Sequence, residues 1–125
     1  MRKALAFVGC LLGSAPVPSA EPAIHIVVQH SALAGFRHYE GHSLWEAMRP
    51  GDDVALVREA DNVYDPNAVR VEWRGHMLGY VPRRQNAHLA RQLDRGVPLA
   101  GRITRLEKSR NGRNRVSYEI LVPLE

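Results

Sequence analysis

The chain has 125 residues, of which 45% are hydrophobic and 24% charged, with 17 Lys and Arg against 13 Asp and Glu. This length suits a single domain with one core and leaves no room for a second. The only cysteine, Cys10, excludes a disulfide within the chain and the cysteine-bearing structural zinc sites. The spacing of the six histidines matches no zinc-ligand pattern, so we expect neither a metal nor another cofactor.

The first twenty residues have the features of a signal peptide. Arg2 and Lys3 give a positive start, and an apolar run leads into a stretch of small residues and proline. This pattern predicts a leader over residues 1–20, cleaved after Ala20, and one domain over residues 21–125. Because the apolar run is too short to span a membrane, we expect an exported, periplasmic protein that is not embedded in the membrane. A mis-assigned start codon, and with it a cytoplasmic protein, is the alternative.

Short strands separated by glycine and proline dominate the rest of the chain. Alternating or β-branched apolar runs predict strands over residues 24–30, 54–59, 68–73, 76–81, 99–106 and 116–122. One helix is predicted over residues 84–95, and residues 44–48 allow one further helical turn. Many short strands and few helices in about 100 residues indicate a mainly β fold, a small closed or nearly closed barrel.

A stiff polar loop precedes the third predicted strand. Asn62, Asp65 and Asn67 are residue types that hydrogen-bond their own backbone, and Pro66 fixes one φ angle. The loop should therefore hold Tyr64 near the rim of the barrel. The strand that follows places one set of apolar side chains on a single face: Val69, Val71 and Trp73.

Positive charge is concentrated in the second half of the chain. Removal of the leader would leave 15 Lys and Arg against 13 Asp and Glu, so the overall excess is modest. The part of the chain from residue 83 onward nevertheless carries ten cations: Arg83, Arg84, Arg91, Arg95, Arg102, Arg105, Lys108, Arg110, Arg113 and Arg115. Arginine forks match phosphate oxygens, which favours a nucleic-acid or other phosphate partner. An ordinary soluble surface is the alternative.

Four motifs, in order, closely resemble the HIRAN domain. They are GFRHYEG at 35–41, VALVRE at 54–59, DNVYDPNAV at 61–69 and LGYVP at 78–82, and the resemblance extends from about residue 24 to residue 124. HIRAN domains occur at the amino end of Swi/Snf-type DNA-remodelling ATPases and as small free-standing bacterial proteins. The resemblance implies an OB-like β-barrel of about six strands with one or two short helices. For the eukaryotic members, it implies recognition of single-stranded DNA at its free 3′ end.

The resemblance also assigns roles to individual residues. Arg37 and Arg83 would each contact a backbone phosphate, while His38 and Tyr64 would stack on a base. Asp65 would accept a hydrogen bond from the terminal 3′ hydroxyl. These roles suit the residue types, since aromatic faces stack on any base and a fixed carboxylate accepts from a hydroxyl.

The sequence departs from the family pattern at two of these positions. His38 stands where the DNA-binding members carry a second stacking tyrosine, and Tyr80 replaces a polar histidine beside the pocket. Tyr39 would substitute for the missing tyrosine if it faces the groove. With Asn62 from the stiff loop, these residues complete the predicted nucleic-acid-binding set: Arg37, His38, Tyr39, Asn62, Tyr64, Asp65, Tyr80 and Arg83.

Structural roles are the alternative for the same residues. The tyrosines would then only cover the barrel end, Asp65 would only cap its own turn, and Arg37 would pair with Glu40 or Asp61 at the surface.

Two other functions stay open beside a nucleic-acid end binder. One is an exported interaction module for a different anionic ligand. The other is a hydrolase whose candidate acid and base residues are Asp52, Asp53, Asp61, Asp65 and His76. The sequence offers no nucleophile motif, ligand cluster or nucleotide-binding loop in support of a hydrolase. We therefore expect a binding domain and not an enzyme.

Overall fold

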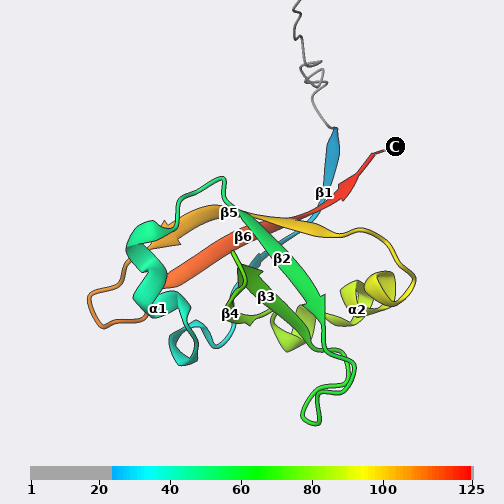
Figure 1. Ribbon diagram of the computed structural model, residues 1–125, viewed down its shortest axis with the longest axis horizontal. Helices are drawn as coiled ribbons and strands as arrows, with labels where there is room; N and C mark the ends of the chain where they lie inside the picture. The colour runs from blue at the N-terminus through cyan, green and yellow to red at the C-terminus, as the bar shows by residue number, and fades with distance from the viewer. Residues whose placement is uncertain (1–23, 125) are drawn as a thin grey trace, which may run out of the picture.

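The computed structural model describes residues 24–124, in which six antiparallel strands form one sheet (Figure 1). Across the sheet the strands follow the order β1-β6-β5-β2-β3-β4. Their bounds are His25–Ala32 for β1, Asp53–Arg58 for β2, Val69–Trp73 for β3, His76–Tyr80 for β4, Ala100–Glu107 for β5 and Arg115–Pro123 for β6. The expected mainly β fold is confirmed. The predicted leader lies outside the described residues, and within residues 24–124 no helix is long and apolar enough to cross a membrane.

Two consecutive residues link distant strands of this sheet, although the sheet itself is not closed. Leu33 donates its N–H to the carbonyl of Val116 in β6 at 3.0 Å, and Ala34 exchanges two backbone hydrogen bonds with Tyr80 in β4 at 2.9 and 3.0 Å. We call Leu33 and Ala34 the strap. The close approach of the strap to β4 requires Gly79, whose φ is 151°, because a Cβ there would lie 2.5 Å from the Ala34 carbonyl oxygen. The result is a nearly closed, OB-like barrel.

The core is filled from the inner face of the sheet. In β3, Val69, Val71 and Trp73 are 0, 0 and 3% exposed, whereas Arg70 and Glu72 between them stay partly exposed. This confirms the period-two prediction for the strand. Each such buried apolar side chain stabilises the fold by about 1.5–3 kcal/mol, so the strand is a rigid support for the loop that precedes it.

Short helices connect the strands. Between β1 and β2 lie η1 (Phe36–His38), α1 (Gly41–Leu44) and η2 (Trp45–Ala47); between β4 and β5 lie η3 (Arg83–Gln85) and α2 (Ala87–Asp94). Figure 1 shows α1 and α2 at opposite ends of the sheet.

The helix predicted over residues 84–95 is shorter in the structure. Regular α-helix begins only at Ala87, because the preceding Asn86 is 1% exposed and donates its Nδ2 to Asp65 Oδ2 at 2.8 Å. Between Pro82 and that residue the chain makes a separate 3-10 turn. A contact with a distant loop therefore interrupts what the local pattern presented as one continuous helix.

Candidate functional site

The site is built on the loop between β2 and β3, which projects from the sheet in Figure 1. The side-chain oxygen of Asn62 accepts the N–H groups of Tyr64 at 2.8 Å and Asp65 at 3.0 Å. Asp65 Oδ1 in turn accepts the N–H of Asn67 at 2.9 Å. These bonds confirm the predicted stiff loop. They hold the Tyr64 side chain in solvent, 83% exposed, where its ring faces are accessible to a ligand.

The loop forms part of a pocket of about 430 Å³, which we call the end pocket. Six of the eight predicted site residues line it: Tyr39, Asn62, Tyr64, Asp65, Tyr80 and Arg83. Ala34, Ala68 and Val81 supply small apolar surface between them. This volume lies within the range of about 300–1,000 Å³ that is common for small-molecule sites, so the pocket suits a single nucleotide better than a folded partner.

Asp65 is the fixed negative charge of the end pocket. Its side chain is 18% exposed, and Oδ2 accepts from Asn86 and lies 3.6 Å from Arg83 Nε. Burial opposes ionisation, but the hydrogen bonds from Asn67 and Asn86 and the charge of Arg83 outweigh it and hold the pKa of Asp65 below its usual range. The carboxylate is therefore ionised at neutral pH. Its two oxygens have about four acceptor positions, which leaves capacity for a donor from a ligand.

Arg83 is held beside this carboxylate by a second contact. Its guanidinium donates to the backbone carbonyl of Tyr64, and its side chain is 68% exposed. The guanidinium has further N–H donors, and these are suited to binding a phosphate group of a ligand. The end pocket thus combines one fixed anion with one accessible cation.

Two further tyrosines give the end pocket an aromatic surface. The rings of Tyr39 and Tyr80 meet edge to face, with centroids 5.9 Å apart and an interplanar angle of 72°. Both side chains are half-buried. Gly35 permits this placement, since a Cβ there would lie 3.3 Å from the ring of Tyr39. The structure therefore places Tyr39 in the lining of the end pocket. This is the position it needs in order to substitute for the stacking tyrosine that His38 replaces.

Glu59 fixes two lining residues of the end pocket and was absent from the predicted set. It accepts from the Tyr80 hydroxyl at 2.8 Å and from Asn62 Nδ2 at 3.0 Å, while Arg70 bonds its second oxygen at 2.9 Å. Burial, together with the hydrogen bond and charge of Glu59, raises the pKa of Tyr80 to about 12. In the sequence Glu59 ends an alternating strand. The only local sign of its role was its position three residues before Asn62, which allows a hydrogen bond between the two side chains.

Arg37 and His38 lie elsewhere. They line a separate hollow of about 390 Å³, the basic hollow, together with Arg113 from the loop between β5 and β6. Arg37 Nε contacts His38 Nε2 at 3.5 Å. His38 and Tyr64, which were expected to stack on one base together, therefore do not line a shared pocket. The segment from Leu33 to Tyr39 contributes residues to both hollows.

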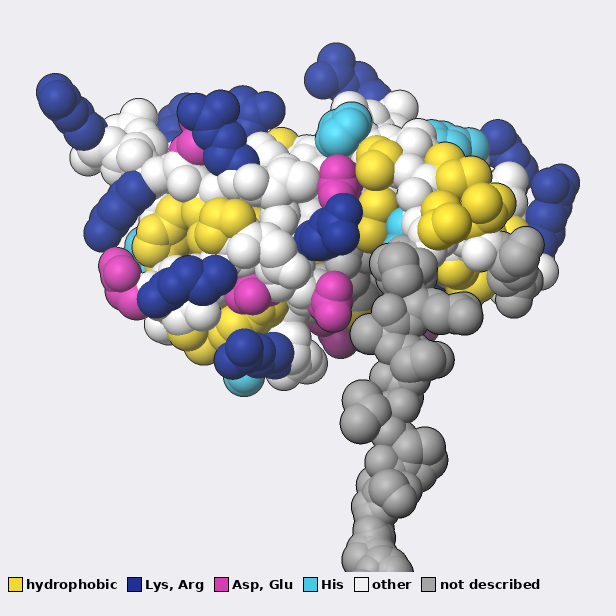
Figure 2. Space-filling view, turned by 90° about the horizontal axis from the view of Figure 1, so that it is seen from above, with side chains coloured by type: hydrophobic (Ala, Val, Ile, Leu, Met, Phe, Trp, Pro, Cys, Tyr) yellow, Lys and Arg dark blue, Asp and Glu magenta, His cyan; other side chains and the backbone are white. Residues whose placement is uncertain are grey.

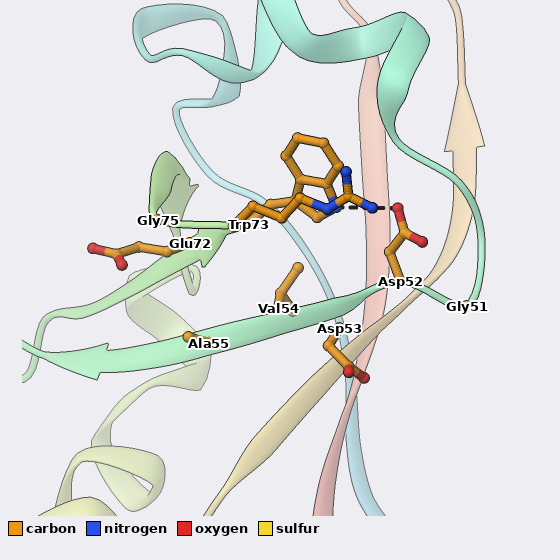
Figure 3. A pocket seen from close by; sticks show the side chains of 9 residues that line it. Gly51, Asp52, Asp53, Val54, Ala55, Glu72, Trp73 and Gly75 are labelled. Atoms are coloured by element: carbon orange, nitrogen blue, oxygen red, sulfur yellow. Dashed lines mark hydrogen bonds between the residues drawn. The ribbon is translucent and has the colours of Figure 1, made fainter.

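A hollow of about 580 Å³, larger than the end pocket, lies at the other end of β3 and is acidic (Figure 3). Asp52 accepts from Trp73 Nε1 at 3.0 Å, and the Arg74 guanidinium stacks 4.5 Å from the Trp73 ring. Asp53 and Glu72 add two more carboxylates. Three carboxylates against one arginine disfavour a phosphate ligand, so the larger volume does not make this hollow a phosphate site.

The residues considered for hydrolysis are not gathered in one place. Asp52 belongs to the acidic hollow, Asp65 to the end pocket, and His76 contacts Glu40 at 3.1 Å. Over residues 24–124, no group of three or more His, Cys, Asp or Glu is placed to hold a metal ion.

In the part of the chain that the structure describes, four of the ten cations from residue 83 onward have acidic partners, Arg83 with Asp65 among them. Arg102 pairs with Glu119, Arg105 with Glu107, and Lys108 with Glu46. On the face drawn in Figure 2, Lys and Arg side chains stand dispersed among hydrophobic and acidic ones and form no continuous block. The positive charge available to a phosphate is therefore local, and its position matters more than the total.

Comparison with known proteins places these features in a family. The family model described as "HIRAN domain" matches residues 26–125. A Fanconi-associated nuclease 1 homolog from Oryza sativa subsp. japonica is 37% identical over 73 residues, covering 55% of this chain and 7% of that protein. A putative SWI/SNF-related matrix-associated actin-dependent regulator of chromatin subfamily A member 3-like 1 from Arabidopsis thaliana is 33% identical over 91 residues, covering 72% and 10%. The chain thus spans a tenth or less of these relatives.

Two solved structures share the fold. A protein from Lactobacillus plantarum superposes with a TM-score of 0.71 at 27% identity, covering 82% of this chain and 98% of that one. The HIRAN domain of human HLTF superposes with a TM-score of 0.62 at 20% identity, covering 82% and 80%. With a family model that matches from β1 to the carboxyl end, the chain belongs to the HIRAN domain family.

Proposed function

We propose that this protein binds nucleic acid, and that the end pocket receives the free 3′ end of a single strand. Family membership supports a nucleic-acid ligand, as do two relatives of which one is named a nuclease and the other a regulator of chromatin. The three tyrosines of the end pocket suit stacking without base preference, because every base has an aromatic face.

The observation that carries the proposal is the ionised, partly buried carboxylate of Asp65 beside the exposed ring of Tyr64. A terminal hydroxyl donates a hydrogen bond to a carboxylate, whereas a terminal phosphate at the same position repels it. Arg83, 3.6 Å from that carboxylate, is placed to bind the next phosphate along the strand. The end pocket should therefore prefer a strand that ends in a hydroxyl over one that ends in a phosphate.

The proposed activity is binding without catalysis. Asp65 has an oriented set of hydrogen bonds, and the lining of the end pocket holds no histidine, cysteine, serine or threonine beside it. The acid–base candidates Asp52 and His76 are bonded to Trp73 and Glu40 instead. A carboxylate in this setting can orient a ligand hydroxyl, and no histidine stands beside it to relay a proton.

Fluorescence anisotropy with labelled ten-nucleotide strands tests the proposal. We expect tighter binding to a free 3′ hydroxyl than to the same strand carrying a 3′ phosphate, with a preference that persists as salt is raised. A 5′-phosphorylated strand serves as the control for added charge at the other end. Equal, weak binding of all three strands that vanishes with salt would refute an end-reading pocket and indicate only non-specific attraction.

We further propose that the protein is exported. The support is the signal-peptide pattern of residues 1–20. Amino-terminal sequencing of the protein purified from its native cells should begin at Glu21, and a sequence that begins at Met1 would contradict export by this route.

A further inference from the structure

The basic hollow joins two segments that are far apart in the sequence. Arg37 and His38 come from η1, and Arg113 and Asn114 come from the loop between β5 and β6. The strap explains the proximity, since Leu33 is hydrogen-bonded to Val116 at the start of β6. Figure 1 shows the orange β5–β6 loop at one side of the molecule and the cyan η1 segment between it and the green β2–β3 loop.

The β5–β6 loop presents its arginine from an ordered turn. Asn114 Oδ1 accepts the N–H of Ser109 at 3.1 Å, and Asn111 Oδ1 accepts the N–H of Arg113 at 3.2 Å. Gly112, at φ 77°, closes the turn by donating its N–H to the Ser109 carbonyl at 3.2 Å. Because the backbone at Arg113 is held by these bonds, less conformational entropy is lost when its side chain binds a ligand.

The guanidinium groups at the basic hollow are not neutralised by acids. Within residues 24–124, neither Arg37 nor Arg113 forms an ion pair with a carboxylate, whereas Lys108 at the start of the same loop contacts Glu46 at 3.5 Å. No carboxylate lines this hollow. Two unpaired guanidinium groups with a histidine beside them form the type of surface that binds phosphate.

We propose that the β5–β6 loop is a second contact for the polymer, in which Arg113, together with Arg37, binds a backbone phosphate inside the strand. This inference rests on the proposed function, because it assumes that the 3′ end of the strand is bound in the end pocket. The polymer then crosses the segment between Gly35 and Tyr39, which has the end pocket on one side and the basic hollow on the other. The end pocket reads the terminus, and the basic hollow adds affinity that depends on strand length.

The test compares strands of three and ten nucleotides with a free 3′ hydroxyl. Arg113→Gln should weaken binding of the ten-nucleotide strand by about three- to tenfold and reduce the salt slope of its binding constant by about 0.7, the value for one phosphate contact on single strands. Binding of the three-nucleotide strand should not change. Arg113→Lys, which keeps the charge, should recover most of the lost affinity.

Arg95→Gln is the matched control, because Arg95 is an exposed arginine at the end of α2 that lines neither pocket. It should leave both strands bound as in the unmodified protein. Equal loss in Arg113→Gln and Arg95→Gln, or no loss with Arg113→Gln, would overturn the second contact. A missing preference for the free 3′ end in the unmodified protein would instead refute the end pocket, while the ten-nucleotide strand would still report on Arg113.

Discussion

Exchange of the side chains at positions 65 and 86 separates recognition from stability. In Asp65→Asn, the amide that replaces Oδ2 faces the Nδ2 of Asn86, so two donors meet where a 2.8 Å hydrogen bond was. Asn86 is 1% exposed, and leaving its donor unsatisfied costs about 1–3 kcal/mol, with the lower value if its amide turns over and accepts instead. The double variant Asp65→Asn/Asn86→Asp restores a donor opposite an acceptor, and its stability should return.

Recognition should behave differently. A hydrogen bond from a hydroxyl to a charged acceptor contributes about 1.5–3 kcal/mol, so Asp65→Asn should lower the preference for a free 3′ end by about ten- to hundredfold. The double variant should not recover this preference, because its carboxylate lies at position 86, just before α2, and not on the loop. Urea denaturation gives the stability, and anisotropy with free and phosphate-blocked strands gives the preference. A double variant that regains both, or a single variant that keeps full preference, would refute the role of Asp65.

Three further predictions concern the supports of the site. Gly79→Ala should destabilise the protein by at least about 1 kcal/mol more than Gly75→Ala in urea denaturation, since only the former meets the Ala34 carbonyl; equal losses would contradict the steric argument. Glu59→Gln should lower the pKa of Tyr80 from about 12 in an ultraviolet titration, and Tyr80→Phe should remove that transition. An unchanged pKa of Tyr80 in Glu59→Gln would mean that burial alone raises it. Because the folded pKa of Glu59 is depressed, its ionised form stabilises the fold above the unfolded value of about 4.3, and this stabilisation is lost as pH falls through the folded pKa. The stability difference between the unmodified protein and Glu59→Gln should therefore shrink below about pH 4, and a constant difference from pH 7 to pH 3 would argue against the charge.

The features that local sequence determines were predictable. The alternation of Val69, Val71 and Trp73 fixed the buried face of β3, because side chains in a strand change face at every residue. The Asn62 and Asp65 turn was equally predictable, since each side chain bonds backbone two or three residues away. The resemblance of the sequence motifs to the HIRAN domain then predicted most of the residues that line the end pocket.

Glu59 and Asn86, whose roles depend on distant partners, were missed. Glu59 bonds Tyr80, and Asp65 bonds Asn86, each across 21 residues of sequence. No periodicity or turn rule connects such pairs, and the second pair also interrupted a helix that the pattern extended. The separation of His38 from Tyr64 has the same origin, because the strap decides on which side of the barrel η1 lies.

The strap also determines when in folding a binding surface exists. Ala34 and Tyr80 are separated by 45 residues of sequence, and contacts of such long range are costly in chain entropy and tend to form late. A folding intermediate with a finished β5–β6 hairpin would already display its arginines, yet it would lack the aromatic walls around Asp65. Such an intermediate would attract polyanions without discrimination, whereas selectivity for a terminus would arise only in the last stage of maturation.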